Sequence, residues 1–209
     1  MYMTRVLLRR KIAPNVIHGI LSKAFPNKRS GETNENLWRI DILGYHYAFI
    51  IVSKEKPDLC QLENLIGKNS LAQEQTRKNL PPNKTIEYTP FIESLNVGQV
   101  WKFRLSANPV EHKKQKDSKE RGKVYALRTI TEQHEWLERQ GSRNGFTINS
   151  CNIVNDSWIA INNIRIRSVS FDGILTISDI DTFRMALTHG IGRGKAYGCG
   201  LLTIVKIND

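Results

Sequence analysis

Residues 37–52 read LWRIDILGYHYAFIIV, and this stretch decides the predicted fold. Two β-prone runs, 37–43 and 45–52, are joined at Gly44, and this pattern predicts a β-hairpin. A hairpin alone does not identify a fold, so the elements on either side of it determine how it is used.

Strand and helix signals flank this hairpin on both sides. Before it, residues 2–10 are β-prone, and residues 14–25 predict a helix that has a proline in its first turn. After it, residues 57–67 predict a short helix, and residues 70–78 form a polar strand candidate. The predicted order is strand, helix, strand, strand, helix, strand.

The same order recurs after the Pro-rich break at residues 80–83. The second set comprises a strand at 100–107, a helix at 131–139 with Thr131 as its possible N-cap, strands at 146–154, 158–161 and 164–177 with turns at Asn155-Asp156 and Asn162-Asn163, a helix at 179–189 and a strand at 201–207. Each set approximates βαββαβ, the ferredoxin-like arrangement. We therefore predict an α+β protein with two tandem ferredoxin-like (RRM-like) domains at residues 1–80 and 99–209, connected by a linker at residues 81–98.

The 209-residue chain carries a formal net charge of +11 and has an isoelectric point near 9.7. A surplus of this size favours a nucleic-acid partner, although a solvated basic surface that only aids solubility gives the same count. No run approaches the roughly 18 apolar residues that span a bilayer, and the N-terminus lacks a signal-peptide pattern. Three widely spaced cysteines, Cys60, Cys151 and Cys199, do not suggest a disulfide framework. We expect a cytoplasmic protein that does not associate with membranes.

One histidine, His18, lies within the helix predicted at residues 14–25. The apolar residues of this helix fall on one face at helical spacing: Val16, Ile17, Ile20, Leu21 and Ala24. His18 and Ser22 point away from that face, so His18 is not predicted to lie in the core. An exposed histidine is most often an ordinary surface residue, but an imidazole can also serve as a general acid or base near neutral pH.

Residues 190–202 read GIGRGKAYGCGLL and form the most specific segment of the sequence. Glycines allow positive φ and bring backbone N–H groups close to an anion, and Arg193 and Lys195 add positive charge. Gly192, Gly194, Arg193 and Lys195 are therefore candidate phosphate contacts; the alternative is that the glycines only permit a tight turn from helix to strand. The spacing matches neither dinucleotide-binding nor P-loop glycine motifs.

Two further basic stretches are candidates for nucleic-acid contacts. Residues 111–123, EHKKQKDSKERGK, predict a basic loop that presents Lys113 and Lys114, unless the loop is only a solvated insertion. Arg165 and Arg167 lie on the same side of a predicted strand, because side chains alternate along it. The competing interpretation is an ordinary amphipathic strand with an arginine face.

Several segments together resemble the CasE family, the CRISPR-repeat endoribonucleases of type I-E systems. The glycine segment matches the terminal glycine-rich loop of the wider superfamily at every position, including Lys195. Residues 17–27, IHGILSKAFPN, are similar to the family's first helix, in which a histidine lies seven residues before a Phe-Pro pair. Shorter similarities are FRLSANP at 103–109, EWL at 135–137 and FDGIL at 171–175. The resemblance covers both ends and the middle of the chain.

The resemblance implies site residues on the predicted helix at 14–25. His18 would be the catalytic residue, acting as base or acid, and Lys23 would help to hold the phosphate. Ser22 is a candidate RNA contact beside them. Asn15 stands where some members of the family carry a tyrosine, so no tyrosine is available there for proton transfer.

The resemblance also implies a reaction and partners. The enzyme would use no metal and no cofactor, and would cut the stem-loop of CRISPR repeat RNA through attack by the RNA's own 2′-OH. The products would be a 2′,3′-cyclic phosphate and a 5′-hydroxyl. A basic hairpin that carries Arg165 and Arg167 would enter the groove of the repeat stem. The protein would stay with the mature crRNA as a subunit of the Cascade complex.

Two other functions remain as alternatives. A metal-dependent nuclease needs converging carboxylates, but the candidates Asp172, Asp179 and Asp181 are typical of turn and helix-cap residues. A non-catalytic tandem RRM-like RNA-binding protein needs a strand with stacking aromatics in the RNP pattern, and no segment of the sequence supplies one.

Overall fold

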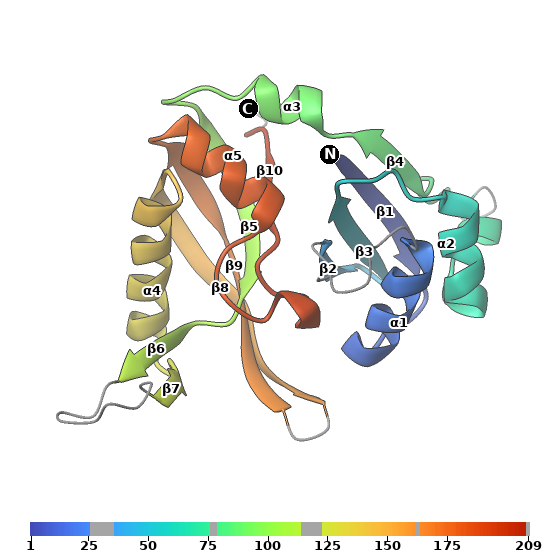
Figure 1. The fold of residues 1–209 in the computed structure, drawn as a ribbon, viewed down its shortest axis with the longest axis horizontal. Coiled ribbons are helices and arrows are strands. Elements are labelled where there is room, and N and C mark those ends of the chain that lie inside the picture. The colour runs from blue at the N-terminus through green and yellow to red at the C-terminus, as the bar shows by residue number, and fades with distance from the viewer. Residues whose placement is uncertain (26–35, 76–78, 114–122, 162–163, 208–209) are drawn as a thin grey trace.

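A computed structural model describes residues 1–25, 36–75, 79–113, 123–161 and 164–207. The described chain forms two units joined by a short helix, α3 (Thr89–Glu93) (Figure 1). The first unit contains, in chain order, β1 (Tyr2–Leu8), α1 (Pro14–Ala24), β2 (Leu37–Leu43), β3 (His46–Ser53), α2 (Leu59–Ile66) and β4 (Lys84–Glu87). Its four strands form one antiparallel sheet in the order β2-β3-β1-β4.

The second unit repeats this plan with one insertion. It contains β5 (Val100–Ala107), β6 (Val110–Lys113), β7 (Lys123–Ala126), α4 (Ile130–Arg143), β8 (Phe146–Ile161), β9 (Ile164–Ile177), α5 (Ile180–His189), the 3-10 turn η3 (Lys195–Tyr197) and β10 (Leu202–Val205). The main sheet has the order β10-β5-β9-β8, and β6 and β7 pair separately. Both sheets therefore have the strand order of the ferredoxin-like arrangement, and the predicted α+β tandem fold is confirmed.

Local signals explain where the helices begin. Pro14 occupies the first turn of α1, where its missing N–H costs nothing. Asp58 caps α2, and Asp179 caps α5 by accepting a hydrogen bond from the Thr182 N–H at 2.8 Å. Helix α4 begins with a capping box that Thr129 and Glu132 form, so the prediction of Thr131 as the N-cap is wrong.

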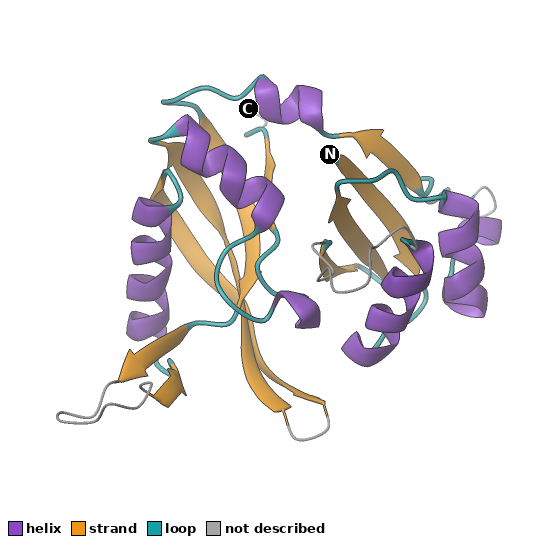
Figure 2. Cartoon of the chain, viewed as in Figure 1, coloured by secondary structure: helices purple, strands orange, loops and turns teal. Residues whose placement is uncertain are grey.

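Helices cover one face of each sheet (Figure 2). In the first unit, Ile17, Ile20 and Leu21 of α1 pack in a core cluster with Trp38 and Phe49 of the sheet. The larger core of the second unit also includes two residues of the first unit, Leu37 and Val52, so apolar packing joins the units. Within the described ranges, no helix is long and apolar enough to cross a membrane.

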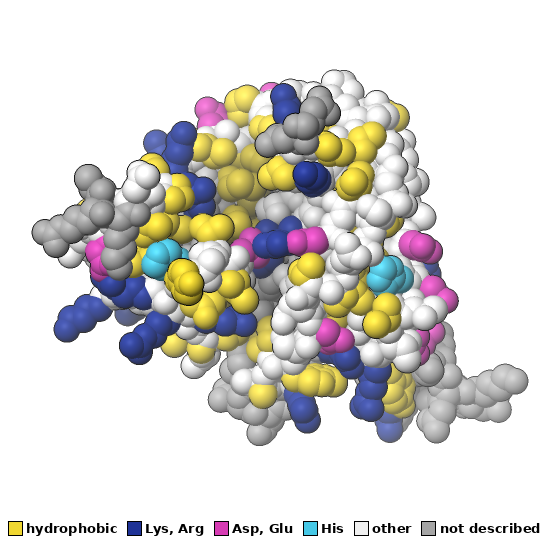
Figure 3. All heavy atoms as spheres, turned by 180° about the vertical axis from the view of Figure 1, so that it is seen from behind, with side chains coloured by type: hydrophobic (Ala, Val, Ile, Leu, Met, Phe, Trp, Pro, Cys, Tyr) yellow, Lys and Arg dark blue, Asp and Glu magenta, His cyan; other side chains and the backbone are white. Residues whose placement is uncertain are grey.

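The other faces of the two sheets border a cleft of about 870 Å³. Strands of both units line it, and Figure 3 shows the hollow between them with apolar side chains on its walls and charged side chains at its base. The cleft lies on the side of each sheet away from the helices, so it is separate from the face that presents α1.

The structure corrects the end of the first unit. The strand predicted at residues 70–78 is wrong for the described part, residues 70–75: Ser70 forms only an isolated β-bridge with Leu8, and the 3-10 turn η2 (Ala72–Glu74) follows. Residues 76–78 lie outside the described residues. The fourth strand is instead β4, which pairs with β1. Strand β4 lies inside the segment predicted as a linker, so the first sheet extends beyond residue 80.

The structure also corrects two features of the second unit. The predicted turn at Asn155-Asp156 is wrong, because β8 continues through these residues with a register shift that a β-bulge absorbs. The predicted loop at 111–123 begins and ends in strands, since β6 pairs with β7 and places Val110 opposite Ala126 and Lys113 opposite Lys123. Residues 114–122 and the predicted turn at Asn162-Asn163 lie outside the described residues.

Candidate active site

Helix α1 presents His18 to solvent. Ile17, Ile20 and Leu21 are buried beneath the helix, and His18 is exposed, as the apolar spacing predicts. Val16 is the exception to the predicted apolar face, because it is 50% exposed.

The neighbours of His18 on the helix differ in their orientation. The Ser22 hydroxyl lies on the same side and donates a hydrogen bond of 2.9 Å to the His18 carbonyl. Lys23 and Asn15 are also exposed, but Lys23 lies on a different side of the helix from His18. The structure therefore groups His18, Ser22 and Asn15 on the exposed surface of α1, with Lys23 set apart from them.

Residues 190–201, here called the glycine loop, connect α5 to β10. Their five glycines all have positive φ, as predicted: Gly190, Gly192, Gly194, Gly198 and Gly200. At Gly198 the requirement is twofold, because φ is +84° and an added Cβ would lie 2.7 Å from the Trp38 ring of β2. The loop thus rests directly on the edge of the first sheet.

The glycine loop also contacts the second unit. The Gly200 N–H donates to the Ser106 carbonyl at 2.6 Å. The backbone of Arg193 forms an isolated antiparallel β-bridge with that of Asn108. The Arg193 guanidinium lies 3.4 Å from Nε2 of His112 on β6. These contacts to β5 and β6 hold the loop at the boundary between the two units.

Helix α1 and the glycine loop meet at η3 (Figure 1). The helix that carries His18 packs against the 3-10 turn that begins with Lys195, which is half-buried. Gly192 and Arg193, next along the loop, are exposed. The helix that carries His18 and the loop that carries Arg193 and Lys195 therefore come from opposite ends of the chain and lie in contact.

The predicted basic hairpin presents its arginines around an aromatic ring. Trp158 of β8 is 40% exposed, and the guanidinium carbons of Arg165 and Arg167 lie 4.8 and 5.7 Å from its ring centroid. Both arginines share one side of β9, as predicted, and Arg128 lines the same shallow recess. The arrangement offers three cations and an aromatic face to a ligand.

Of these two arginines, only Arg167 pairs with a carboxylate among the described residues. Arg167 donates to both Asp156 oxygens, one of them at 2.7 Å, and this pairing lowers the pKa of the Asp156 carboxyl. Gln133 of α4 also donates to Asp156 at 3.1 Å, so Arg167 helps to fasten the hairpin to α4. Arg165 is exposed and stacks only on Trp158 among its described contacts.

The hairpin and the glycine loop are neighbours. A Cβ at Gly194 would lie 3.4 Å from Cδ1 of Ile166. Because side chains alternate along β9, Arg165 and Arg167 project from the hairpin face opposite to Ile166. Lys113 lies at the end of β6, and Lys114 lies outside the described residues.

Some residues of this region were not singled out from the sequence. Trp38 and Trp136 support the glycine loop beneath Gly198 and Gly192, and Trp158 and Arg128 extend the arginine face of the hairpin. Of these, Trp158 is the one that local pattern could have indicated, because it begins the predicted strand at 158–161 that directly precedes the strand with Arg165 and Arg167. The other contacts depend on how distant segments pack.

Two βαββαβ units with a glycine loop at their boundary define a tandem ferredoxin-like protein. A family profile described as CRISPR associated protein matches residues 1–206, and the chain belongs to this family. It is 28% identical to the CRISPR-associated endoribonuclease Cse3 of Thermus thermophilus, over 98% of this chain and 99% of that protein. It is 24% identical to the Cascade subunit CasE of Escherichia coli, over 99% of this chain and 100% of that one.

Solved structures share the fold. The structure of Thermus thermophilus Cse3 bound to an RNA representing a pre-cleavage complex matches with a TM-score of 0.74 at 24% identity, covering 98% of this chain and 100% of that chain. The crystal structure of Cas6e from Escherichia coli matches with a TM-score of 0.67 at 23% identity, covering 99% and 100%.

Proposed function

We propose that this chain is an endoribonuclease that cleaves precursor CRISPR RNA within the repeat stem-loop. The observation that carries the proposal is the contact between α1, which presents His18, and the glycine loop, which carries Lys195. The full-length relatives in Thermus thermophilus and Escherichia coli are named as an endoribonuclease and a Cascade subunit, which supports this activity.

The proposed reaction uses the RNA's own 2′-OH and no metal ion. The 2′-oxygen loses its proton and bonds to the adjacent phosphorus, while the bond from phosphorus to the 5′-oxygen breaks and that oxygen takes up a proton. His18 would accept the first proton or donate the second, and such a group contributes typically 10²- to 10⁴-fold. Lys195 and loop N–H groups would stabilise the charge that grows on the phosphate, and Lys23 would have to reach it with its long side chain from another side of α1. The products are a 2′,3′-cyclic phosphate and a 5′-hydroxyl.

The repeat stem would be bound mainly through its shape and phosphates. Paired RNA hides its base edges in a deep, narrow groove, so cationic side chains read its backbone. Arg165, Arg193 and the β6–β7 hairpin with Lys113 and Lys114 would supply these contacts. Gly192 and Gly194 would let the glycine loop approach a phosphate closely.

The protein would keep the mature crRNA and join other Cascade subunits in the cytoplasm. The two units would act as separate domains with a short linker. In this division β4 belongs with the first domain, because it completes the first sheet. Helix α3 then begins the connection, and Arg184 of α5 holds that segment by donating to the Ile92 and Leu95 carbonyls at 3.1 Å each.

Labelled repeat RNA from the protein's own genome tests the proposal. We expect one cut in the repeat, and no cut in a control RNA in which one strand of the stem is scrambled so that it cannot pair. An uncut repeat, or equal cutting of both RNAs, would contradict the proposed function.

The exposed arginine of the hairpin gives a separate expectation for binding. Arg165→Ala removes one phosphate contact, so affinity for the stem-loop should fall and the slope of log K against log salt should become shallower by about 1. Arg143→Ala is the matched control, because it removes the same charge from the exposed last turn of α4. Binding titrations at several salt concentrations measure both; an unchanged slope for Arg165→Ala would remove the hairpin from the RNA interface.

A further inference from the structure

Arg39 of β2 is a charged residue in the interior of the protein. Its side chain is 3% exposed and lines the cleft between the two sheets. A buried guanidinium is costly unless its five N–H donors find acceptors. Where those acceptors lie therefore shows what the residue does.

The acceptors of Arg39 belong to both units. Within β2, Nε and Nη2 donate to the two Asp41 oxygens at 2.7 and 2.9 Å. Across the cleft, Nη1 donates to the carbonyls of Arg104 at 3.1 Å and Leu201 at 2.8 Å, and Nη2 donates to the Thr203 hydroxyl at 2.8 Å. All five donors are used, and three of the bonds cross between the units.

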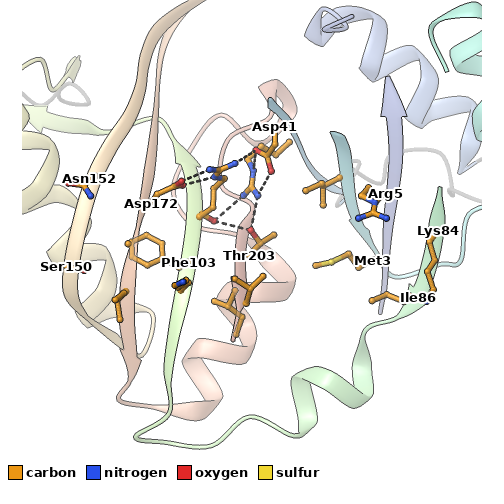
Figure 4. Close-up of a pocket in the computed structure, with 18 residues that line it drawn as sticks. Met3, Arg5, Asp41, Lys84, Ile86, Phe103, Ser150, Asn152, Asp172 and Thr203 are labelled. Carbon is orange, nitrogen blue, oxygen red and sulfur yellow. Dashed lines mark hydrogen bonds and ion pairs between the residues drawn. The ribbon is translucent and has the colours of Figure 1, made fainter. Parts of the chain in front are cut away.

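A second ion pair extends the same network. Arg104 of β5 pairs with both oxygens of Asp172 on β9, and its Nη1 lies 3.8 Å from Asp41 (Figure 4). The four charges alternate in sign, with two from each unit: Arg39 and Asp41 of β2, then Arg104 of β5 and Asp172 of β9. If the two sheets moved apart, Arg39 would lose its three acceptors in the second unit and Asp41 would lose Arg104, so these contacts fix the distance between the sheets.

The network is connected to both parts of the candidate active site. Leu201, which accepts from Arg39, is the last residue of the glycine loop. The preceding residue of β2, Trp38, lies beneath Gly198 of that loop and packs in the same core cluster as Ile17 of α1. Because side chains alternate along a strand, Trp38 and Arg39 fasten β2 to the loop from its two faces.

We propose that Arg39 is a positioning residue of the endoribonuclease, which holds the glycine loop of the second unit at the distance from α1 that the reaction requires. The inference rests on the proposed function. Arg39 lies in the cleft and not on the surface of α1, so it sets the geometry of the reacting groups without contacting the scissile phosphate. Loss of this geometry should slow the chemical step and leave RNA affinity nearly unchanged.

Three variants and a control test this role. Arg39→Lys keeps the charge but lacks the planar fork that reaches both units. Thr203→Val is gentler, because it removes one bond between the units and leaves the Arg39–Asp41 pair in place. Arg39→Ala removes the whole connection. Lys102→Ala is the matched control, since Lys102 is an exposed cation that lines the same cleft.

Two measurements separate the chemical step from binding. Single-turnover cleavage of repeat RNA at saturating protein gives the rate of the chemical step, and the same RNA with a 2′-deoxy nucleotide at the cut gives the dissociation constant. We expect Arg39→Lys and Arg39→Ala to cut roughly 10- to 100-fold more slowly, and Thr203→Val about fivefold more slowly, with dissociation constants within about threefold of wild type. Lys102→Ala should cut at the wild-type rate. A wild-type rate for folded Thr203→Val and Arg39→Lys, or a loss confined to affinity, would overturn the proposal.

Hydrogen exchange in the glycine loop gives a measurement that needs no cleavage. Backbone amides of the loop should exchange faster in Arg39→Lys and Thr203→Val than in wild type and Lys102→Ala. If wild type fails to cut RNA but this difference is present, the proposed function fails and the coupling stands. If wild type cuts and the variants match it in both rate and exchange, the inference about Arg39 fails alone.

Discussion

His18→Ala should bind repeat RNA with wild-type affinity and cut it at least about 100-fold more slowly, because the substitution removes the group proposed to move protons and leaves the basic surfaces intact. His18 is exposed, and its helix is held by Ile17, Ile20 and Leu21, so the variant should keep its fold. Single-turnover cleavage at saturating protein measures the chemical step directly.

The control for this variant is His134→Ala on α4, which removes a partly exposed histidine from a different helix of the second unit. It should cut at the wild-type rate. If His18→Ala also cuts at that rate, the imidazole has no part in the reaction and the assignment of α1 as the catalytic helix is wrong.

Gly198→Ala should lower the cleavage rate by roughly 10- to 100-fold, because a displaced loop no longer faces the reacting phosphate. The added Cβ would lie 2.7 Å from the Trp38 ring, so either the loop or the ring must move. The variant also places alanine at a φ of +84°, which costs about 1–2 kcal/mol of stability. Cleavage rate and thermal unfolding are measured together.

Gly98→Ala separates the collision from the backbone cost. Gly98 has almost the same φ, +83°, but an added Cβ would meet no atom within 4 Å. Both variants should therefore share the backbone cost, but only Gly198→Ala should lose further stability to the collision and only Gly198→Ala should lose activity. Equal activity of the two variants would show that contact between the glycine loop and β2 does not matter for catalysis.

Periodicity in the sequence predicted most of the fold. The strands at 37–43 and 100–107 match the structure to the residue, because their apolar residues alternate clearly. Strand β4 was missed because it has only four residues, follows two prolines and pairs solely with β1, which a local pattern does not reveal. The Asn155-Asp156 turn was predicted from residue type, but pairing with β9 keeps this segment extended.

The candidate site was predictable to the extent that it depends on local chemistry. Helical spacing predicted that His18 is exposed, and the glycine spacing predicted the positive φ angles of the loop. The roles of Trp38 and Arg39 were not predictable, because they depend on contacts with residues more than a hundred positions away. The sequence does contain one sign of the role of Arg39. Arg39 and Asp41 are the only charged residues in the run 37–43, and they share one side of its strand.

The most direct test of the central claim is to incubate wild-type protein and repeat RNA in excess EDTA and to map the new ends. The account predicts that cutting continues at the rate seen without chelator and leaves a 2′,3′-cyclic phosphate on one fragment and a 5′-hydroxyl on the other. Cutting that stops in EDTA and returns with Mg²⁺, or a 5′-phosphate end, would contradict it.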